Sequence, residues 1–142
     1  MPRGNIKMLY YLCYGTPLMD RTLERRVDSL RLEGQGRLEG WRMSFNRQGG
    51  HPILEEATGA KTWGCLFLID ETKLDVLDQV EDGTRHSGTV YFEGYQVPCV
   101  WYSYPKTGDQ PGQEFLENFR SVYVQASLPN AQIDSALGAV KA

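Results

Sequence analysis

The segment from Thr62 to Ile69 constrains the fold more than any other part of the chain. It reads Thr-Trp-Gly-Cys-Leu-Phe-Leu-Ile, a short apolar run that predicts a buried β-strand. A strand of this kind needs neighbours on both sides, so we expect it at the centre of a sheet. Gly64 within the run indicates that another backbone, or a ligand, comes close at that point.

Other short runs predict the neighbours of this strand. They are Lys7–Tyr14, Leu30–Glu33, Arg37–Phe45, Pro52–Ala57, Thr89–Phe92 and Tyr95–Tyr104. In the third run Trp41, Met43 and Phe45 alternate with polar or small residues, which is typical of a half-buried strand. Glu93-Gly94 separates the last two runs as a turn and predicts a β-hairpin.

Helices are predicted between and after these strands. They cover Asp20 to Val27 with Asp20 as N-cap, Leu74 to Glu81 after an Asp70 cap, Gln113 to Gln125, and Asn130 to Val140 with Asn130 as N-cap. The polar segments 84–88 and 105–112 are expected to be connections. Because strands and helices do not strictly alternate, the pattern favours an α+β fold with a mixed, strongly curved sheet or a small barrel. With 142 residues, we expect one domain over residues 1–142.

Charge and hydropathy remove several classes of function. The formal net charge is −3, and the aromatic strands carry no interleaved basic residues, so nucleic-acid binding is not expected. No apolar run approaches the ~20 residues that a membrane-spanning helix needs. The first seven residues lack the apolar segment of a signal peptide, and we expect a cytoplasmic protein without membrane contact.

Three cysteines lie in apolar runs without paired spacing: Cys13, Cys65 and Cys99. This pattern predicts reduced thiols packed as small hydrophobic side chains. A catalytic cysteine paired with His51 or His86 is the alternative, although nothing in the spacing supports it. The histidines and cysteines do not cluster at ligand spacing, so no metal site is expected.

Glu81 is the candidate for proton transfer. Leu74, Leu77 and Glu81 lie at i, i+3 and i+7, on one face of the predicted helix, and Gly83 follows as a stop signal. Glu81 therefore faces inward at the C-terminal end of the helix, where burial and the helix dipole both raise the pKa of a carboxyl group. Such a group suits general acid–base chemistry near neutral pH. The alternative is a structural glutamate that turns to solvent or pairs with an arginine.

The loop after the first strand is the candidate binding element. Gly15-Thr16-Pro17 connects the first strand to the first helix, so backbone N–H groups are presented at a helix start. That arrangement suits an anionic ligand group. An ordinary strand-to-helix turn would have the same sequence.

Five short motifs follow one another along the chain. They are Tyr14-Gly15-Thr16-Pro17-Leu18, Arg37-Leu38-Glu39-Gly40-Trp41, Thr62-Trp63-Gly64-Cys65, Leu77-Asp78-Gln79-Val80-Glu81 and Leu128-Pro129. In this order they resemble the γ-glutamylcyclotransferase family, including its γ-glutamylamine branch. The family pattern is Tyr-Gly-Ser-Asn-Leu, Arg-Leu-x-(Gly or Asp)-aromatic, Val-Trp-Gly-Val, Leu-Asp-x-x-Glu-Gly and Leu-Pro. The resemblance covers nearly the whole chain.

The resemblance implies a small β-barrel with flanking helices and a cyclotransferase activity without a cofactor. The α-amine of a γ-glutamyl amine or amino acid attacks its own γ-carbonyl, which releases 5-oxoproline. Glu81 falls on the essential glutamate of the family. The segment from Tyr14 to Leu18 would bind the glutamyl group, and Tyr91 is the nearest candidate for a tyrosine that contacts the substrate in the family.

The chain departs from the family pattern at several positions. Thr16-Pro17 replaces Ser-Asn, which removes an amide side chain and a backbone donor. Asp82 is inserted beside Glu81 and either raises its pKa further or is solvated. Phe115 stands where some members carry a tyrosine. These departures leave two alternatives open: a non-catalytic small-molecule-binding protein on the same barrel, or a hydrolase or lyase that uses Glu81 on an unrelated substrate.

Overall fold

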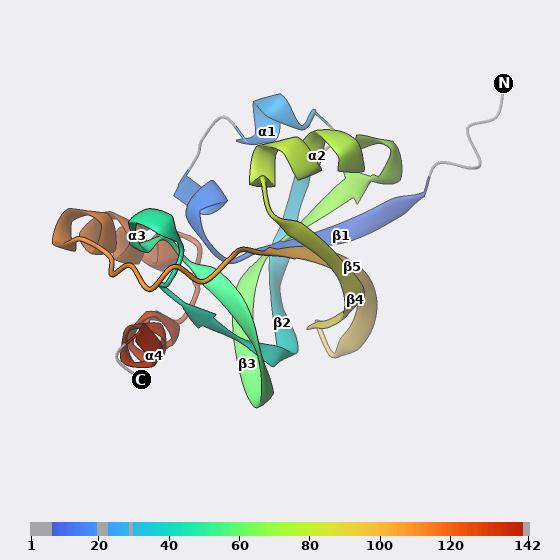
Figure 1. The fold of residues 1–142 in the computed structure, drawn as a ribbon. Helices are drawn as coiled ribbons and strands as arrows, with labels where there is room; N and C mark the ends of the chain where they lie inside the picture. The colour runs from blue at the N-terminus through green and yellow to red at the C-terminus, as the bar shows by residue number, and fades with distance from the viewer. Residues whose placement is uncertain (1–6, 20–22, 29, 141–142) are drawn as a thin grey trace, which may run out of the picture.

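Five strands close into a β-barrel in the computed structural model, which describes residues 7–19, 23–28 and 30–140 (Figure 1). The strands are β1 (Met8–Cys13), β2 (Arg31–Ser44), β3 (Ile53–Asp70), β4 (Thr84–Phe92) and β5 (Tyr95–Ser103). Their order around the barrel is β1-β3-β2-β4-β5. The central place predicted for the Thr62–Ile69 run is confirmed, because β3 lies between β1 and β2.

The pairing makes the barrel mixed. β1 is antiparallel to β3, from Met8 opposite Asp70 to Cys13 opposite Cys65. On its other side β1 runs parallel to β5, with Tyr11 opposite Val100. Antiparallel pairing of β2 with β3, and of β4 with both β2 and β5, completes the barrel. The predicted α+β class with a small mixed barrel is confirmed.

Two strands are longer than the sequence predicts. The runs Leu30–Glu33 and Arg37–Phe45 are parts of one 14-residue strand, β2, and Pro52–Ala57 and Thr62–Ile69 are parts of the 18-residue β3. Register shifts in the β2–β3 ladder let these long strands bend without ending. At Gly36 a Cβ atom would lie 2.6 Å from the Leu66 side chain, so the glycine marks close packing rather than a break.

β4 also begins earlier than predicted. The polar segment 84–88 is its first half, which pairs with β5 from Thr84 opposite Ser103 onwards. Most of its side chains are exposed and only His86 is half-buried. The segment therefore lacks the alternation of apolar residues by which a strand is recognised.

The helices form two groups (Figure 1). The α-helices are α1 (Leu23–Arg26), α2 (Leu74–Glu81), α3 (Gln113–Gln125) and α4 (Asn130–Val140), and single 3-10 turns are η1 (Thr16–Met19), η2 (Gln48–Gly50) and η3 (Glu71–Lys73). α1 and α2 lie together at one end of the barrel, and α3 and α4 lie together beside β2 and β3. The predicted flanking helices are therefore present.

The predicted helix caps have different outcomes. Asp70 accepts a hydrogen bond from the Thr72 backbone N–H at 2.9 Å, so this cap is confirmed, with the η3 turn between it and α2. Asn130 is the first residue of α4, and its buried Oδ1 atom accepts no hydrogen bond in the described part of the chain. The prediction of Asn130 as N-cap is therefore wrong. Asp20 lies outside the described residues.

The barrel interior is apolar and rich in aromatic rings. Tyr11, Leu66 and Leu77 are fully buried, and the three cysteines are free and buried, as predicted. Gly64 lies where a Cβ atom would be 2.8 Å from the Cys13 carbonyl oxygen. The close neighbour predicted at Gly64 is thus the backbone of β1.

Candidate active site

Glu81 points into the molecule at the end of α2. Leu77 is fully buried one turn earlier on the same face, and Glu81 is only 5% exposed. Asp82 ends the helix in the left-handed conformation, with φ 53°, and donates its N–H to the Asp78 carbonyl at 2.9 Å. The inward position predicted for Glu81 is confirmed, and the alternative in which it turns to solvent is wrong.

Two tyrosines hold the Glu81 carboxylate. Tyr11 of β1 donates its hydroxyl to Oε2, and Tyr104, just after β5, donates its hydroxyl to Oε1. Burial raises the pKa of each tyrosine, and the nearby charge of Glu81 raises it further, so both hydroxyls keep their protons. Each carboxylate oxygen retains a lone pair, which leaves Glu81 free to accept a proton from a third group.

The pKa of Glu81 is raised above the ordinary 4.5, and burial is the main cause. The hydrogen bonds from Tyr104 and Tyr11 and the positive charge of Arg47 oppose this effect. The carboxyl group thus has the character of a general base or acid closer to neutral pH.

The loop after β1 lies against Glu81. A small cavity of about 10 Å³ is lined by Tyr14, Gly15, Thr16, Pro17, Arg47, Pro52, Glu81 and Tyr104. The Tyr14 hydroxyl donates to the Tyr102 carbonyl at 2.7 Å, and the Gly15 carbonyl accepts the Leu18 N–H at 2.9 Å. The structure therefore brings four of the predicted loop residues to Glu81, whereas Leu18 packs against the core instead.

A larger cavity of about 300 Å³ shares two residues with the small one. Its lining is Thr16, Arg47, Gln48 and His51. Thr16 Oγ1 lies 3.0 Å from His51 Nδ1, within hydrogen-bonding distance. Partial burial and the charge of Arg47 lower the pKa of His51, so this ring is neutral at neutral pH.

Arg47 lies at the boundary between the two cavities. Its guanidinium carbon lies 3.7 Å from the centre of the Tyr104 ring, which is a cation–π contact. Since the Tyr104 hydroxyl binds Glu81, the arginine is joined to the carboxylate through a single side chain.

Three other residues singled out by the sequence lie apart from Glu81. Tyr91 contacts the Arg37 guanidinium, 4.7 Å from its ring centre, and accepts a hydrogen bond from Gln96; it lines neither cavity. Asp82 is exposed and is not a cause of the raised pKa of Glu81, which favours the solvated alternative. Phe115 makes an edge contact with His51, with ring centres 4.9 Å apart.

Tyr11, Tyr104 and Arg47 were not singled out by the sequence. Tyr11 stands beside Tyr10 in an apolar run, and only the register of β1 shows which ring faces inward. Tyr104 ends a run of aromatic residues that resembles ordinary barrel wall. Arg47 falls in a loop, where no periodicity indicates a direction.

A third cavity lies away from Glu81. This groove of about 570 Å³ lies between α4 and the strands β2 and β3, and Lys61, Trp63 and Gln132 are part of its lining. Gln132 is already engaged, because its amide bonds to both the N–H and the carbonyl of Trp63. None of the groups with a shifted pKa lines this groove, so the site with acid–base character is the one at Glu81.

The residues that the structure describes contain neither a metal-binding cluster nor a membrane-spanning helix. No group of three or more His, Cys, Asp or Glu side chains there is placed to hold a metal ion. None of the helices in residues 7–19, 23–28 and 30–140 is long and apolar enough to cross a membrane.

Residues 11–120 match the model of the family described as "Gamma-glutamyl cyclotransferase, AIG2-like". The chain belongs to this family. Among solved structures, one titled "Gamma-glutamyl cyclotransferase" is 20% identical, with a TM-score of 0.72 over 96% of this chain and 88% of the other. An uncharacterized protein from Homo sapiens is also 20% identical, with a TM-score of 0.71 over 95% and 87% of the two chains.

An AIG2-like protein from Mus musculus is 21% identical, with a TM-score of 0.56 over 77% of this chain and 82% of the other. At these identities the structural matches show a shared fold. None of the curated proteins matches the sequence significantly.

Proposed function

We propose that this protein is a γ-glutamyl cyclotransferase with Glu81 as its general base and acid. The observation that carries the proposal is the buried Glu81 carboxylate, with a raised pKa and two tyrosine donors, directly beside the loop of Gly15 and Thr16. Membership of the family supports the same reaction.

Glu81 begins the reaction by accepting a proton from the α-ammonium group of a γ-glutamyl compound. The freed amine attacks the γ-carbonyl carbon, and a C–N bond forms that closes a five-membered ring. The bond between the γ-carbon and the leaving nitrogen then breaks, and protonated Glu81 gives its proton to that nitrogen. The surplus proton of the ring nitrogen passes through Glu81 to the freed amine, which departs as an ammonium group. The products are 5-oxoproline and a free amine or amino acid, so the atoms balance without water or a co-reactant.

Tyr11 and Tyr104 keep the carboxylate in place during this cycle. Each donates to a different oxygen of Glu81, which fixes the orientation of the carboxylate and limits the rise of its pKa. Because the nucleophile and the carbonyl belong to one molecule, a folded substrate alone lowers the barrier by several kcal/mol.

The loop of Tyr14, Gly15, Thr16 and Pro17 binds the glutamyl group in this proposal. The Thr16 backbone N–H and the Thr16 hydroxyl are the donors that this loop offers, since Pro17 has no N–H and the Gly15 N–H is hydrogen-bonded to the Cys13 sulfur. They suit a carboxylate or the oxyanion that develops on the γ-carbonyl. A glutamyl group is larger than the 10 Å³ cavity at Glu81, so substrate binding requires this cavity to widen. Tyr91 has other contacts and is not part of the proposed site.

Formation of 5-oxoproline from γ-glutamylalanine tests the proposal. We expect the wild type to form 5-oxoproline and alanine in equal amounts, and Glu81→Gln to lose at least about 100-fold in kcat, the scale of general acid–base catalysis. Asp82→Asn is the matched control, because Asp82 is the exposed neighbouring carboxylate. Circular dichroism should show the same fold in all three proteins. An unfolded Glu81→Gln variant would assign a structural role to Glu81.

The alternatives predict different outcomes. A hydrolase or lyase that uses Glu81 on an unrelated substrate would leave γ-glutamylalanine unchanged. A binding protein would bind γ-glutamylalanine in calorimetry with no turnover, and the altered Thr16-Pro17 loop is the observation that favours this alternative. Either result would replace the proposed cyclotransferase.

A further inference from the structure

Arg47 is a half-buried cation that forms no ion pair with another described residue. The ion pairs among the described residues employ other arginines and lysines, such as Arg42 with Glu55 and Arg85 with Asp78. Arg47 stacks on the Tyr104 ring, and its charge acts on Glu81, Tyr14 and His51. No described residue accepts a hydrogen bond from the Arg47 guanidinium, so its N–H donors are available to another group.

The 300 Å³ cavity beside Arg47 has the chemistry of an anion site. Its described lining contains one cation and no carboxylate. Thr16 supplies a hydroxyl, Gln48 lies at the rim with an amide, and His51 is a neutral ring. The described lining of this cavity therefore has a net positive charge, whereas the chain as a whole has a net charge of −3. The volume is at the lower end of the range for small-molecule sites and suits an amino acid rather than a long chain.

We infer that Arg47 determines substrate specificity by binding a carboxylate on the leaving group, so that the preferred substrates are γ-glutamyl amino acids rather than γ-glutamyl amines. This inference rests on the proposed function, because it places the α-ammonium of the substrate at Glu81. The glutamyl group then occupies the small inner cavity. Its γ-carbonyl substituent extends past Arg47, the boundary residue, into the larger cavity.

Arginine suits this role better than the other polar residues of the cavity. Its planar guanidinium group can bind a carboxylate through two parallel hydrogen bonds. Stacking on Tyr104 fixes the plane of the group. A γ-glutamyl amine carries nothing that could pair with this charge, so its binding would leave the guanidinium without an anionic partner.

A pair of substrates that differ in one group tests the inference. γ-Glutamylalanine releases alanine, and γ-glutamylethylamide releases ethylamine, which is alanine without its carboxylate. We expect the wild type to prefer γ-glutamylalanine by about 10- to 100-fold in kcat/KM, mainly through KM, which is the range of a charge-assisted hydrogen bond. In Arg47→Gln the ratio of the two kcat/KM values should fall to about twofold or less.

Arg31→Gln is the matched control for this experiment. The Arg31 side chain is 68% exposed, pairs with Glu33 and lines neither cavity, so the wild-type ratio should persist. Arg47→Lys should keep part of the preference, because it retains the charge but loses the paired donors. An unchanged ratio in Arg47→Gln would overturn the inference. An equal loss for both substrates would also overturn it, since Arg47 would then serve the glutamyl end, which they share.

Calorimetry separates this inference from the proposed reaction. The dissociation constants of both compounds are measured with Glu81→Gln and with the double variant Glu81→Gln, Arg47→Gln. Tighter binding of γ-glutamylalanine that disappears in the double variant supports the carboxylate contact even if the wild type shows no turnover. Equal binding of both compounds to Glu81→Gln contradicts the contact even if the wild type is an active cyclotransferase.

Discussion

The buried position of Glu81 suits proton transfer but lowers the folding stability of the protein. Burial favours the neutral form of its carboxyl group, and its folded-state pKa lies above the ordinary 4.5. At pH values above about 4.5, the Glu81 carboxyl group loses its proton more readily in the unfolded chain than in the folded protein. Folding stability must therefore fall as the pH rises from about 4.5 through the raised pKa of Glu81, and the full cost is present at higher pH.

Glu81→Gln should remove this pH dependence. We expect the melting temperature of the variant, relative to wild type, to rise as the pH increases from about 4.5 into the neutral range, because Gln stays neutral. Thermal unfolding followed by circular dichroism at a series of pH values measures it. Glu56→Gln, at an exposed position of β3, should show no such trend. A difference in melting temperature between Glu81→Gln and wild type that stays the same at every pH would contradict the destabilisation assigned to ionised Glu81.

Tyr104→Phe should shift the acid limb of the pH profile of kcat/KM to higher pH. The Tyr104 hydroxyl is the largest of the effects that lower the pKa of Glu81, so its loss raises that pKa further. The acid limb of kcat/KM, which reports the base in the free enzyme, should then shift to higher pH. Tyr102→Phe is the control, because the Tyr102 hydroxyl donates to Asp78 at 2.6 Å and not to Glu81. An acid limb at the same pH in Tyr104→Phe would show that the hydroxyl does not control Glu81.

At the scale of single residues, the sequence predicts which way a side chain points from its own helix. It does not predict which side chains of other elements will form hydrogen bonds with it. The 3.6-residue period was enough to turn Glu81 inward with Leu77. Its tyrosine partners lie 70 and 23 positions away, at Tyr11 and Tyr104. Their meeting depends on closure of the barrel through the parallel β1–β5 pair, which no local pattern contains.

The junction between α2 and β4 determines how closely Tyr104 approaches Glu81. Asp82 takes the left-handed conformation, and the chain then passes through Gly83 into β4. A Cβ atom at Gly83 would lie 2.5 Å from the Tyr104 ring and 2.7 Å from the Ser103 carbonyl oxygen. Gly83, expected from the sequence as a stop signal, is thus required for packing.

Gly83→Ala should disturb both stability and activity. The added methyl group must displace the Tyr104 ring or the backbone of Ser103, at a cost of about 1–3 kcal/mol for overpacking. Urea unfolding measures the stability, and 5-oxoproline formation should fall as Tyr104 moves from Glu81. Gly112→Ala is the control, because a Cβ atom there meets nothing within 4 Å. Equal behaviour of the two variants would show that the junction tolerates a side chain.

At the scale of elements, the sequence predicts which segments are strands better than where they end. The apolar period marks each strand, but a bulge in the β2–β3 ladder looks like a break in that period. Gly34 and Gly36 have the composition of a turn, yet they lie within β2 and pair with Leu66 and Gly64. The exposed start of β4 gives no apolar signal at all, and only its ladder with β5 identifies it.

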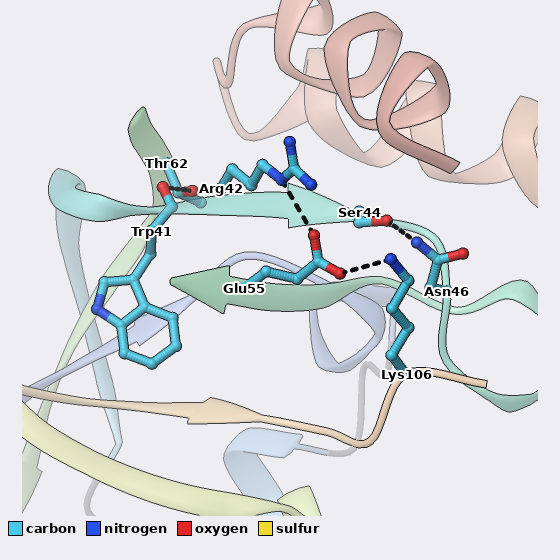
Figure 2. Close-up of polar contacts among 7 residues, drawn as sticks. All are labelled: Trp41, Arg42, Ser44, Asn46, Glu55, Thr62 and Lys106. Carbon is cyan, nitrogen blue, oxygen red and sulfur yellow. Dashed lines mark hydrogen bonds and ion pairs between the residues drawn. The ribbon is translucent and has the colours of Figure 1, made fainter. Parts of the chain in front are cut away.

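At the scale of the whole molecule, the segment 105–112 connects the barrel to α3 and packs on the loop that carries Arg47. Glu55 of β3 lies between Arg42 and Lys106, with N–O distances of 3.0 and 3.4 Å (Figure 2). The Asn46 side chain donates to the Ser44 hydroxyl, and its backbone carbonyl accepts from the segment. The order of Arg47 therefore depends on contacts made far along the chain.

Thr107 makes the central contact of this segment. Its hydroxyl donates to the Asn46 carbonyl at 2.7 Å, and the N–H groups of Thr107 and Gly108 donate to the same oxygen. Thr107→Val keeps the shape of the side chain but removes the hydroxyl donor. We expect a loss of about 1 kcal/mol in the free energy of unfolding, the usual contribution of one hydrogen bond.

Amide hydrogen exchange should show which part of the chain is destabilised in Thr107→Val. In Thr107→Val the amides of residue 107 and Gly108 should exchange faster, because the segment detaches from Asn46 more often, while the amides of the β1–β3 ladder keep their rates. Thr89→Val, at an exposed position of β4, should change neither. Because the Asn46 carbonyl directly precedes Arg47, the preference for γ-glutamylalanine over γ-glutamylethylamide should also weaken in Thr107→Val. Unchanged exchange at residues 107 and 108 would show that the segment is held without this hydroxyl, and the loop of Arg47 would then be ordered by β2 and β3 alone.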